Sequence, residues 1–169
     1  MVRRGDPSAM KAIYCAYAGY LTGVCTRYIS DNDDVKDILH DAFLKIFAAV
    51  GKFEYRGAGS LKAWLTRVTV NEALKAIRRN HRAELMSMTT EPADAPAEDP
   101  ETSSIDAATL HSLIRNLPLG YRTVFNLYVM EEKSHKEIAS ILGISESTSA
   151  SQLHRAKAML AGQIKKRML

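Results

Sequence analysis

Acidic and histidine side chains gather in one short stretch of the chain, at Asp33, Asp34, Asp37, His40 and Asp41. Carboxylate and imidazole groups can hold a catalytic metal ion, and Asp37, His40 and Asp41 can share one helix face. No second cluster completes such a site, and the sequence contains neither an H-E-x-x-H motif nor a glycine-rich phosphate loop. We therefore predict a protein that is not an enzyme, with no catalytic residue, metal ion or cofactor.

A basic row lies further along the chain and suits contact with nucleic acid. Its members are spaced by four, four, three and four residues, so they share one face of a helix; they are Arg67, Asn71, Lys75, Arg78 and Arg82. A glycine-bearing loop before this helix carries Tyr55 and Arg56. The row could follow a phosphate backbone while the loop holds an unstacked base. A solvated basic face is the alternative that the spacing leaves open.

The third candidate region, near the C-terminus, predicts a pair of short helices. Ser134 and Glu137 have the S-x-x-E spacing of a capping box. Gly143 suits the left-handed residue that ends a helix, and Ser145 suits the N-cap of the next one. This is the layout of a helix-turn-helix, whose second helix enters a DNA major groove. Ordinary helical hairpins with a glycine turn share it.

The second helix of this pair has two faces. Ser149, Leu153, Ala156 and Leu160 recur at the helical period, which predicts a buried stripe. We expect the opposite surface to be exposed and to hydrogen-bond base edges or phosphates. That surface carries Ser147, Thr148, Ser151, Arg155 and Ala158, with Gln152, His154 and Lys157 on its flanks.

Charge divides the 169 residues into three segments. Residues 1–82 carry a net charge of +6, residues 83–104 a net charge of −6, and residues 105–169 a net charge of +4. The middle segment contains three prolines, no aromatic residue and no positive charge, so it cannot bury enough apolar surface to offset its chain entropy. This pattern predicts two basic folded units joined by a flexible acidic linker.

Helical periodicity dominates both units, and we predict an all-α fold. The first unit should contain three helices, over about 8–29, 32–47 and 61–82. We expect the first helix to bury Ala12, Ile13, Ala16, Tyr20 and Val24; the second to bury Val35, Ile38, Leu39, Ala42, Phe43 and Ile46; and the third to bury Ala63, Val70, Leu74 and Ile77.

The chain has only two cysteines and no run of the ~18–20 apolar residues that a membrane span needs. Cys15 and Cys25 would lie roughly 15 Å apart on one helix, too far for a disulfide. No signal-peptide pattern is present, so we expect a cytoplasmic location.

Three blocks of sequence, in this order, resemble bacterial RNA polymerase sigma factors of the extracytoplasmic-function (ECF) group. The blocks are residues 33–47, residues 61–73 and residues 117–125, the last opening the unit that holds the helix-turn-helix. The resemblance implies three parts: region 2 over 5–82, a linker over 83–105, and region 4 over 106–163. It implies an initiation factor that binds core RNA polymerase and directs it to promoters.

The resemblance also implies a role for each surface. Asp37, His40 and Asp41 match positions that dock on the polymerase clamp. For the −10 element, Asn71 would hold a flipped-out base in a pocket formed with the loop of Tyr55 and Arg56. The adjacent strand would be held by Lys75, Arg78 and Arg79. The duplex −35 element would be read by Thr148, Ser151, Gln152, His154 and Arg155. An anti-sigma factor is a further expected partner.

Three departures from the family pattern and two alternative functions accompany this interpretation. His40 stands where glutamine is usual in the family, and Ala150 and Gln152 occupy positions that are often basic. A sigma mimic that only binds an anti-sigma factor would not need the Asn71 row. A stand-alone helix-turn-helix regulator would leave the first 82 residues unexplained.

Overall fold

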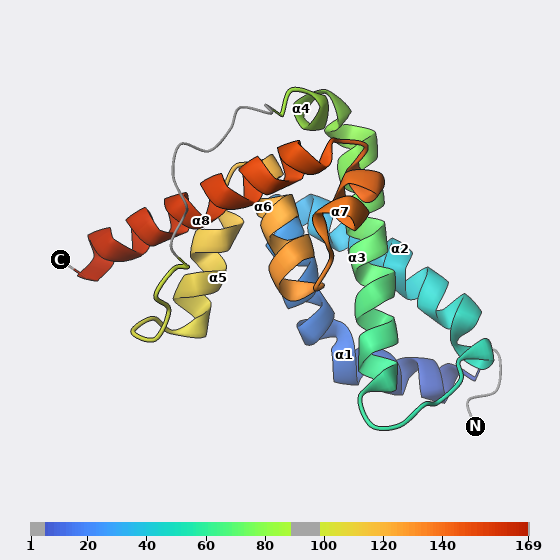
Figure 1. Ribbon diagram of the computed structural model, residues 1–169. Helices are drawn as coiled ribbons and strands as arrows, with labels where there is room; N and C mark the ends of the chain where they lie inside the picture. The colour runs from blue at the N-terminus through green and yellow to red at the C-terminus, as the bar shows by residue number, and fades with distance from the viewer. Residues whose placement is uncertain (1–5, 89–98, 169) are drawn as a thin grey trace. The chain divides into compact units, whose positions relative to one another are not determined.

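The computed structural model describes residues 6–88 and 99–168, and over these ranges it contains helices and no β-strand (Figure 1). The all-α prediction is therefore confirmed. The chain divides into two compact units, Met1–Ile77 and Arg78–Leu169, and the division falls within one helix, α3. Much of the predicted acidic linker, residues 89–98, lies outside the described residues.

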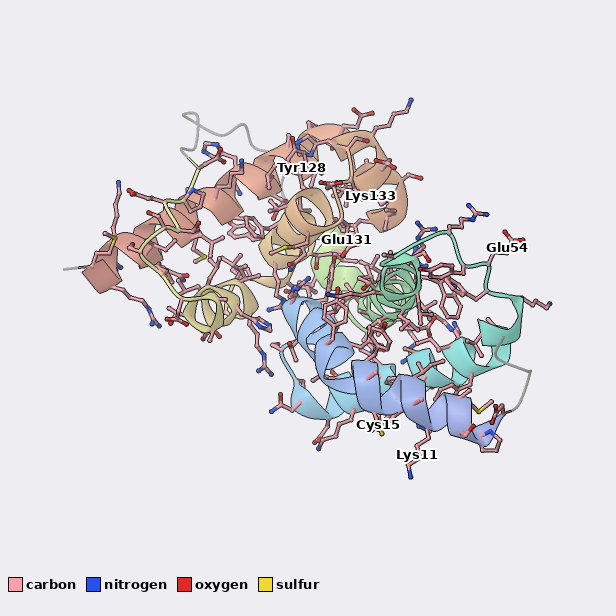
Figure 2. The ribbon with its side chains drawn as sticks, turned by 90° about the horizontal axis from the view of Figure 1, so that it is seen from below. Lys11, Cys15, Glu54, Tyr128, Glu131 and Lys133 are labelled. Carbon is pink, nitrogen blue, oxygen red and sulfur yellow. The ribbon has the colours of Figure 1, made fainter. Side chains whose placement is uncertain are left out.

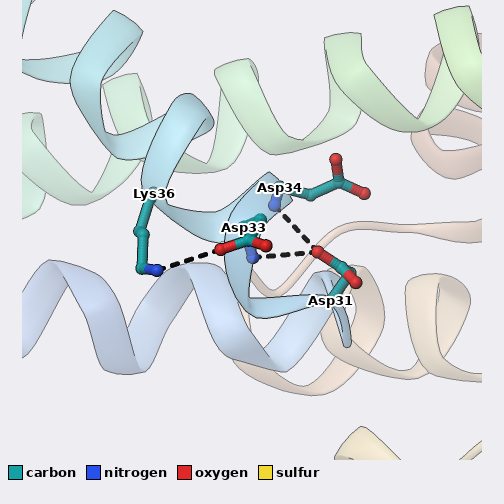
Figure 3. A network of polar contacts seen from close by, with 4 residues as sticks. All are labelled: Asp31, Asp33, Asp34 and Lys36. Carbon is teal, nitrogen blue, oxygen red and sulfur yellow. Dashed lines mark hydrogen bonds and ion pairs between the residues drawn. The ribbon is translucent and has the colours of Figure 1, made fainter.

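The first unit contains α1 (Pro7–Tyr28), α2 (Asn32–Ala49), the short η1 (Val50–Lys52) and most of α3 (Ser60–Asn80). These bounds agree with the predicted helices to within about two residues. α2 begins where the carboxylate of Asp31 accepts hydrogen bonds from the amides of Asp33 and Asp34, at 2.8 and 3.0 Å (Figure 3). Asp33 in turn pairs with Lys36 at 2.9 Å. An N-cap followed by two acidic residues complements the positive end of the helix dipole.

The predicted buried face of α2 is right except at Leu39, which is half-buried, and the faces of α1 and α3 are partly wrong. In α1, Ala12 and Ala16 are exposed, whereas Leu21, Cys25 and Tyr28 join Ile13 and Val24 in the core. The large side chains set the buried stripe of α1, and the two alanines fall outside it on the helix surface. Ala63 of α3 is also exposed.

The second unit contains the C-terminal end of α3 and six further elements: α4 (Arg82–Met86), α5 (Ala107–Arg115), α6 (Leu119–Phe125), the π-helical η2 (Asn126–Met130), α7 (His135–Leu142) and α8 (Glu146–Met168). The long α8 packs along α6 and α7. α4 lies inside the segment expected to be a linker, yet it packs on α6 and buries Leu85. The start of that segment is therefore part of the folded unit.

A buried arginine ties α5 to α6. Arg122 donates hydrogen bonds to the carbonyl oxygens of Arg115 and Leu117, at 2.8 and 2.9 Å. Burial lowers the pKa of its guanidinium, with the nearby Glu84 acting in the opposite direction. The Arg115 carbonyl belongs to the last residue of α5, and the Leu117 carbonyl follows just after the helix. The side chain therefore satisfies one acceptor that the helix leaves without an amide partner and fixes the turn that follows it.

The two cysteines differ in their surroundings. Cys25 is fully buried, and burial raises the pKa of its thiol to about 12. Cys15 is exposed on α1, one turn after Lys11 (Figure 2). None of the described helices combines the length and the apolar character that a bilayer-crossing segment requires.

Candidate nucleic-acid interface

The predicted capping box at the start of α7 is present. The Ser134 amide donates to the Glu137 carboxylate at 2.8 Å, and the Glu137 amide donates to the Ser134 hydroxyl at 3.2 Å. These hydrogen bonds lower the pKa of Glu137, and Lys133 lowers it further. Two otherwise unpaired amides at the helix start are satisfied reciprocally, which fixes where α7 begins.

The turn between α7 and α8 also has the predicted geometry. Gly143 has φ of 69° and ψ of 34°, in the left-handed region that glycine adopts without a Cβ clash. The amides of Gly143 and Ile144 both donate to the Ala139 carbonyl, at 2.9 and 3.1 Å. The Ser145 hydroxyl accepts from the Thr148 amide at 3.0 Å and so caps α8. Together α7, this turn and α8 form a helix-turn-helix.

The predicted buried stripe of α8 is confirmed, because Ser149, Leu153, Ala156 and Leu160 are all buried. The expectation that the opposite polar residues are exposed is wrong at three positions. Thr148, Ser151 and Gln152 are only 3%, 6% and 3% exposed. Ser147 and Ala158 are exposed, and His154 and Arg155 are half-buried.

Local hydrogen bonding explains part of this burial. The Thr148 hydroxyl lies 2.8 Å from that of Ser145, and the Ser151 hydroxyl donates to the Thr148 carbonyl at 3.1 Å. Short hydroxyl side chains readily turn back onto their own backbone in this way. Gln152 lies against α6, where a Cβ on Gly120 would be 3.0 Å from its Oε1.

A histidine that the sequence did not single out fastens α7 to its neighbours. The ring of His135 stacks on that of Tyr128, which Figure 2 labels, at 4.8 Å between centroids. The Nδ1 atom of His135 lies 2.9 Å from the Ser149 hydroxyl. Burial lowers the pKa of His135, and the charge of Glu146 partly counteracts this. No spacing rule predicts the contact, because it joins an irregular π-helical turn to two helices.

The basic row lies on the exposed side of α3, as predicted. Arg67, Asn71, Lys75, Arg78 and Arg79 are all exposed, while Arg82 falls beyond the end of α3 at Asn80. Beside Asn71, the nearly buried Glu72 pairs with Lys45 of α2. This ion pair was not predicted, and it anchors the middle of the row to the rest of the first unit.

A hollow of about 560 Å³ opens at the start of the row. It is lined by Lys52, Phe53, Glu54, Arg56, Ser60, Ala63, Trp64 and Arg67. Phe53 and Trp64 meet with ring centroids 5.3 Å apart, so the lining combines an aromatic pair with basic side chains. Asn71 lies one helical turn beyond Arg67 and does not line the hollow.

The loop that forms the hollow is shaped by its glycines and by local hydrogen bonds. Gly57 and Gly59 have φ of 108° and 83°, values that side chains disfavour. The Arg56 amide donates to the Ser60 hydroxyl at 3.2 Å, and the Arg56 guanidinium pairs with Glu54 at 3.2 Å. Tyr55 is exposed at the tip of the loop.

The acidic face of α2 adjoins an apolar groove. Asp37, His40 and Asp41 are exposed, as predicted. A groove of about 660 Å³ runs between α1 and α2, and His40 lines it together with Phe43 and the exposed side chains of Tyr14 and Leu44. Over the described residues, no group of three histidine, cysteine or carboxylate side chains is placed to share a metal ion.

A helix-turn-helix in one unit and an exposed basic row beside an aromatic hollow in the other define a DNA-binding protein of two helical units. Comparison with protein families matches residues 13–83 to "Sigma-70 region 2" and residues 107–160 to "Sigma-70, region 4". The chain belongs to the sigma factors of the ECF group, and it is a transcription initiation factor that directs RNA polymerase to promoters.

Relatives along nearly the whole chain support this membership. The chain is 29% identical to the RNA polymerase sigma-H factor of Pseudomonas aeruginosa over 92% of its own length and 86% of the relative's. It is 27% identical to the ECF RNA polymerase sigma-E factor of Haemophilus influenzae, over 96% and 91%. The fold is similar to that of the sigma factor RpoE in a co-crystal structure with the anti-sigma factor NepR from Bartonella quintana, with a TM-score of 0.51 and 24% identity over 92% of this chain and 96% of that one.

Proposed function

We propose that the two units divide promoter recognition, with region 2 melting the −10 element and region 4 reading the −35 element. The observation that carries this division is the exposed row of α3 beside the aromatic and basic hollow. Region 2 corresponds to residues 5–82 and region 4 to residues 106–163, joined by residues 83–105. Phosphodiester chemistry belongs to the polymerase, so this chain is not an enzyme. Because its partners are polymerase and promoter DNA, we propose that it acts in the cytoplasm.

Melting is favoured when an unstacked base gains contacts that duplex DNA does not offer. The hollow is large enough to receive a base, which Trp64 or Phe53 can contact through a ring face. Arg56 lines the hollow, and the exposed Tyr55 precedes it in the same loop. Asn71, Lys75, Arg78 and Arg79 extend along α3, where amide and cationic groups can hold the adjoining single strand.

Reading of the −35 element falls to the N-terminal half of α8. His154 and Arg155 are at least partly accessible and can reach base edges or phosphates. Thr148, Ser151 and Gln152 are buried in the free protein, so their part in reading requires the surface around them to open.

Docking on the polymerase is assigned to α2. Asp37 and Asp41 can pair with basic groups on the clamp of the largest subunits, while His40 and the groove beside it accept apolar side chains. An anti-sigma factor is a further proposed partner, supported by the RpoE–NepR co-crystal structure to which this fold is similar.

Transcription by core polymerase on a library of promoters tests the initiation role. Promoter-dependent transcripts are expected, and their absence while the core complex forms would refute it. Asn71→Ala should reduce open-complex formation by roughly 5- to 150-fold, because an unsatisfied base edge costs about 1–3 kcal/mol. Permanganate reactivity of the melted thymines measures this. If the Asn71→Ala variant melts the promoter as well as the native chain does, Asn71 does not hold the unstacked base.

A further inference from the structure

The segment that enters the second unit lies against the surface that we assign to −35 recognition. We define the strap as residues 82–88, which comprise α4, Ser87 and Met88. Leu85 is buried, and α4 packs on α6. The strap is therefore part of the second unit's packing.

Met88 occupies the space over a glycine of α6. A Cβ on Gly120 would lie 2.8 Å from the terminal methyl carbon of Met88 and 3.2 Å from its sulfur. The same Cβ would lie 3.0 Å from Oε1 of Gln152. The side chains of Met88 and Gln152 therefore both lie beside Gly120.

A second contact lies on the other side of α8. The carboxylate of Asp99 pairs with the ammonium group of Lys157, whose side chain is only 23% exposed. A carboxylate at a lysine of a DNA-binding helix takes the place that a backbone phosphate would occupy. Met88 and Asp99 are the described residues that adjoin residues 89–98, and both lie against elements of the second unit.

We propose that the strap and Asp99 compete with duplex DNA for region 4, so that the free protein holds its −35-reading surface partly covered. The strap excludes DNA beside Gln152, and Asp99 neutralises Lys157. Displacement of both contacts exposes the surface. This inference rests on the proposed reading role of α8.

Duplex affinity of the full-length chain tests the competition, with a short fluorescent duplex of mixed sequence as the probe. Met88→Ala and Asp99→Asn should each tighten binding about threefold, the size expected when one partly exposed contact is released. Met159→Ala is the matched control for methionine loss, since Met159 is an exposed side chain on α8. Glu101→Gln is the matched control for charge, since its carboxylate accepts from the nearby Ser103 hydroxyl. Equal tightening by Glu101→Gln and Asp99→Asn, or none by Met88→Ala, would overturn the proposal.

Thiol reactivity supplies an independent measurement. In a Cys15→Ser background, Met88→Cys should react more slowly than Ser87→Cys, and duplex DNA should raise its rate; the buried Cys25 has a raised pKa and stays silent. Equal reaction rates for Met88→Cys and Ser87→Cys in the free protein would contradict the proposal that the strap is packed against the second unit.

Arg155→Ala separates the two proposals. If it does not weaken duplex binding, the reading role of α8 fails. If it does weaken binding while Met88→Ala changes nothing, the strap alone fails.

Discussion

α3 and α8 are both assigned to DNA, and they present their polar residues differently. The α3 row consists of long cationic side chains and one asparagine, all exposed. α8 relies on short hydroxyls and a glutamine at positions 148, 151 and 152, and these are buried. Long charged side chains reach solvent wherever their helix face is open, whereas short hydroxyls can bond their own helix. Spacing alone therefore predicted an exposed polar face on α3 more accurately than on α8.

Core substitutions should give the largest difference between the two units, because each should lower the unfolding free energy of one unit and leave that of the other unchanged. Leu160→Ala removes a fully buried side chain of the second unit and should cost about 2–5 kcal/mol of unfolding free energy. Trp64 is the only tryptophan and lies in the first unit, so its fluorescence reports on that unit alone. We expect Leu160→Ala to shift the helical circular-dichroism transition in denaturant and to leave the Trp64 transition in place.

The matched control is Leu65→Ala, which removes an equally buried leucine of the first unit. It should shift the Trp64 transition instead. A Trp64 transition that moves with Leu160→Ala would show that the units unfold together.

The charge of the α3 row can be measured through salt dependence. Lys75→Ala should reduce the slope of log affinity against log salt by about 0.7 for a single-stranded probe, the value for one lost phosphate contact. Lys62→Ala is the matched control, because Lys62 is exposed on another side of α3, above the Tyr20 ring at 4.2 Å. Equal changes in slope for both variants would mean that overall charge, and not the row, determines binding.

Local rules predicted most of what is local in this protein. Ser134, Glu137 and Gly143 act through hydrogen bonds and backbone angles within a few residues of themselves, so their sequence pattern was sufficient. The burial of Gln152, the pair between Lys45 and Glu72 and the packing of Leu85 depend on which helix faces which. Those pairings join residues tens of positions apart, and no periodicity specifies them. Ala12 and Ala16 were misplaced because alanine tolerates either side of a helix.

Helix caps offer a finer comparison of the two units. Asp31→Ala removes the cap of α2, and Ser134→Ala removes half of the capping box of α7. Each should cost about 1 kcal/mol of unfolding free energy. Only Asp31→Ala should move the Trp64 transition, and Asp31→Asn, which retains a capping oxygen, should recover most of the loss. If Ser134→Ala also shifted the Trp64 fluorescence transition, the two units would not unfold independently.

The smallest expected effect is a pH dependence confined to the second unit. Burial lowers the pKa of His135, so the unfolded chain binds its proton at a higher pH than the folded chain does. The neutral ring therefore stabilises the fold at pH above the usual histidine pKa, and this stability falls as pH drops below about 6.5. Glu146 opposes the effect, since its negative charge favours the protonated ring. Denaturant midpoints of the second unit, measured between pH 7.5 and about 5, should decline slightly in the native chain and less in His135→Asn. The capping carboxylates Asp106 and Glu137 have lowered pKa values and stay ionised over this range, so they should not contribute to the decline. An identical decline in both chains would show that groups other than His135 cause the pH dependence.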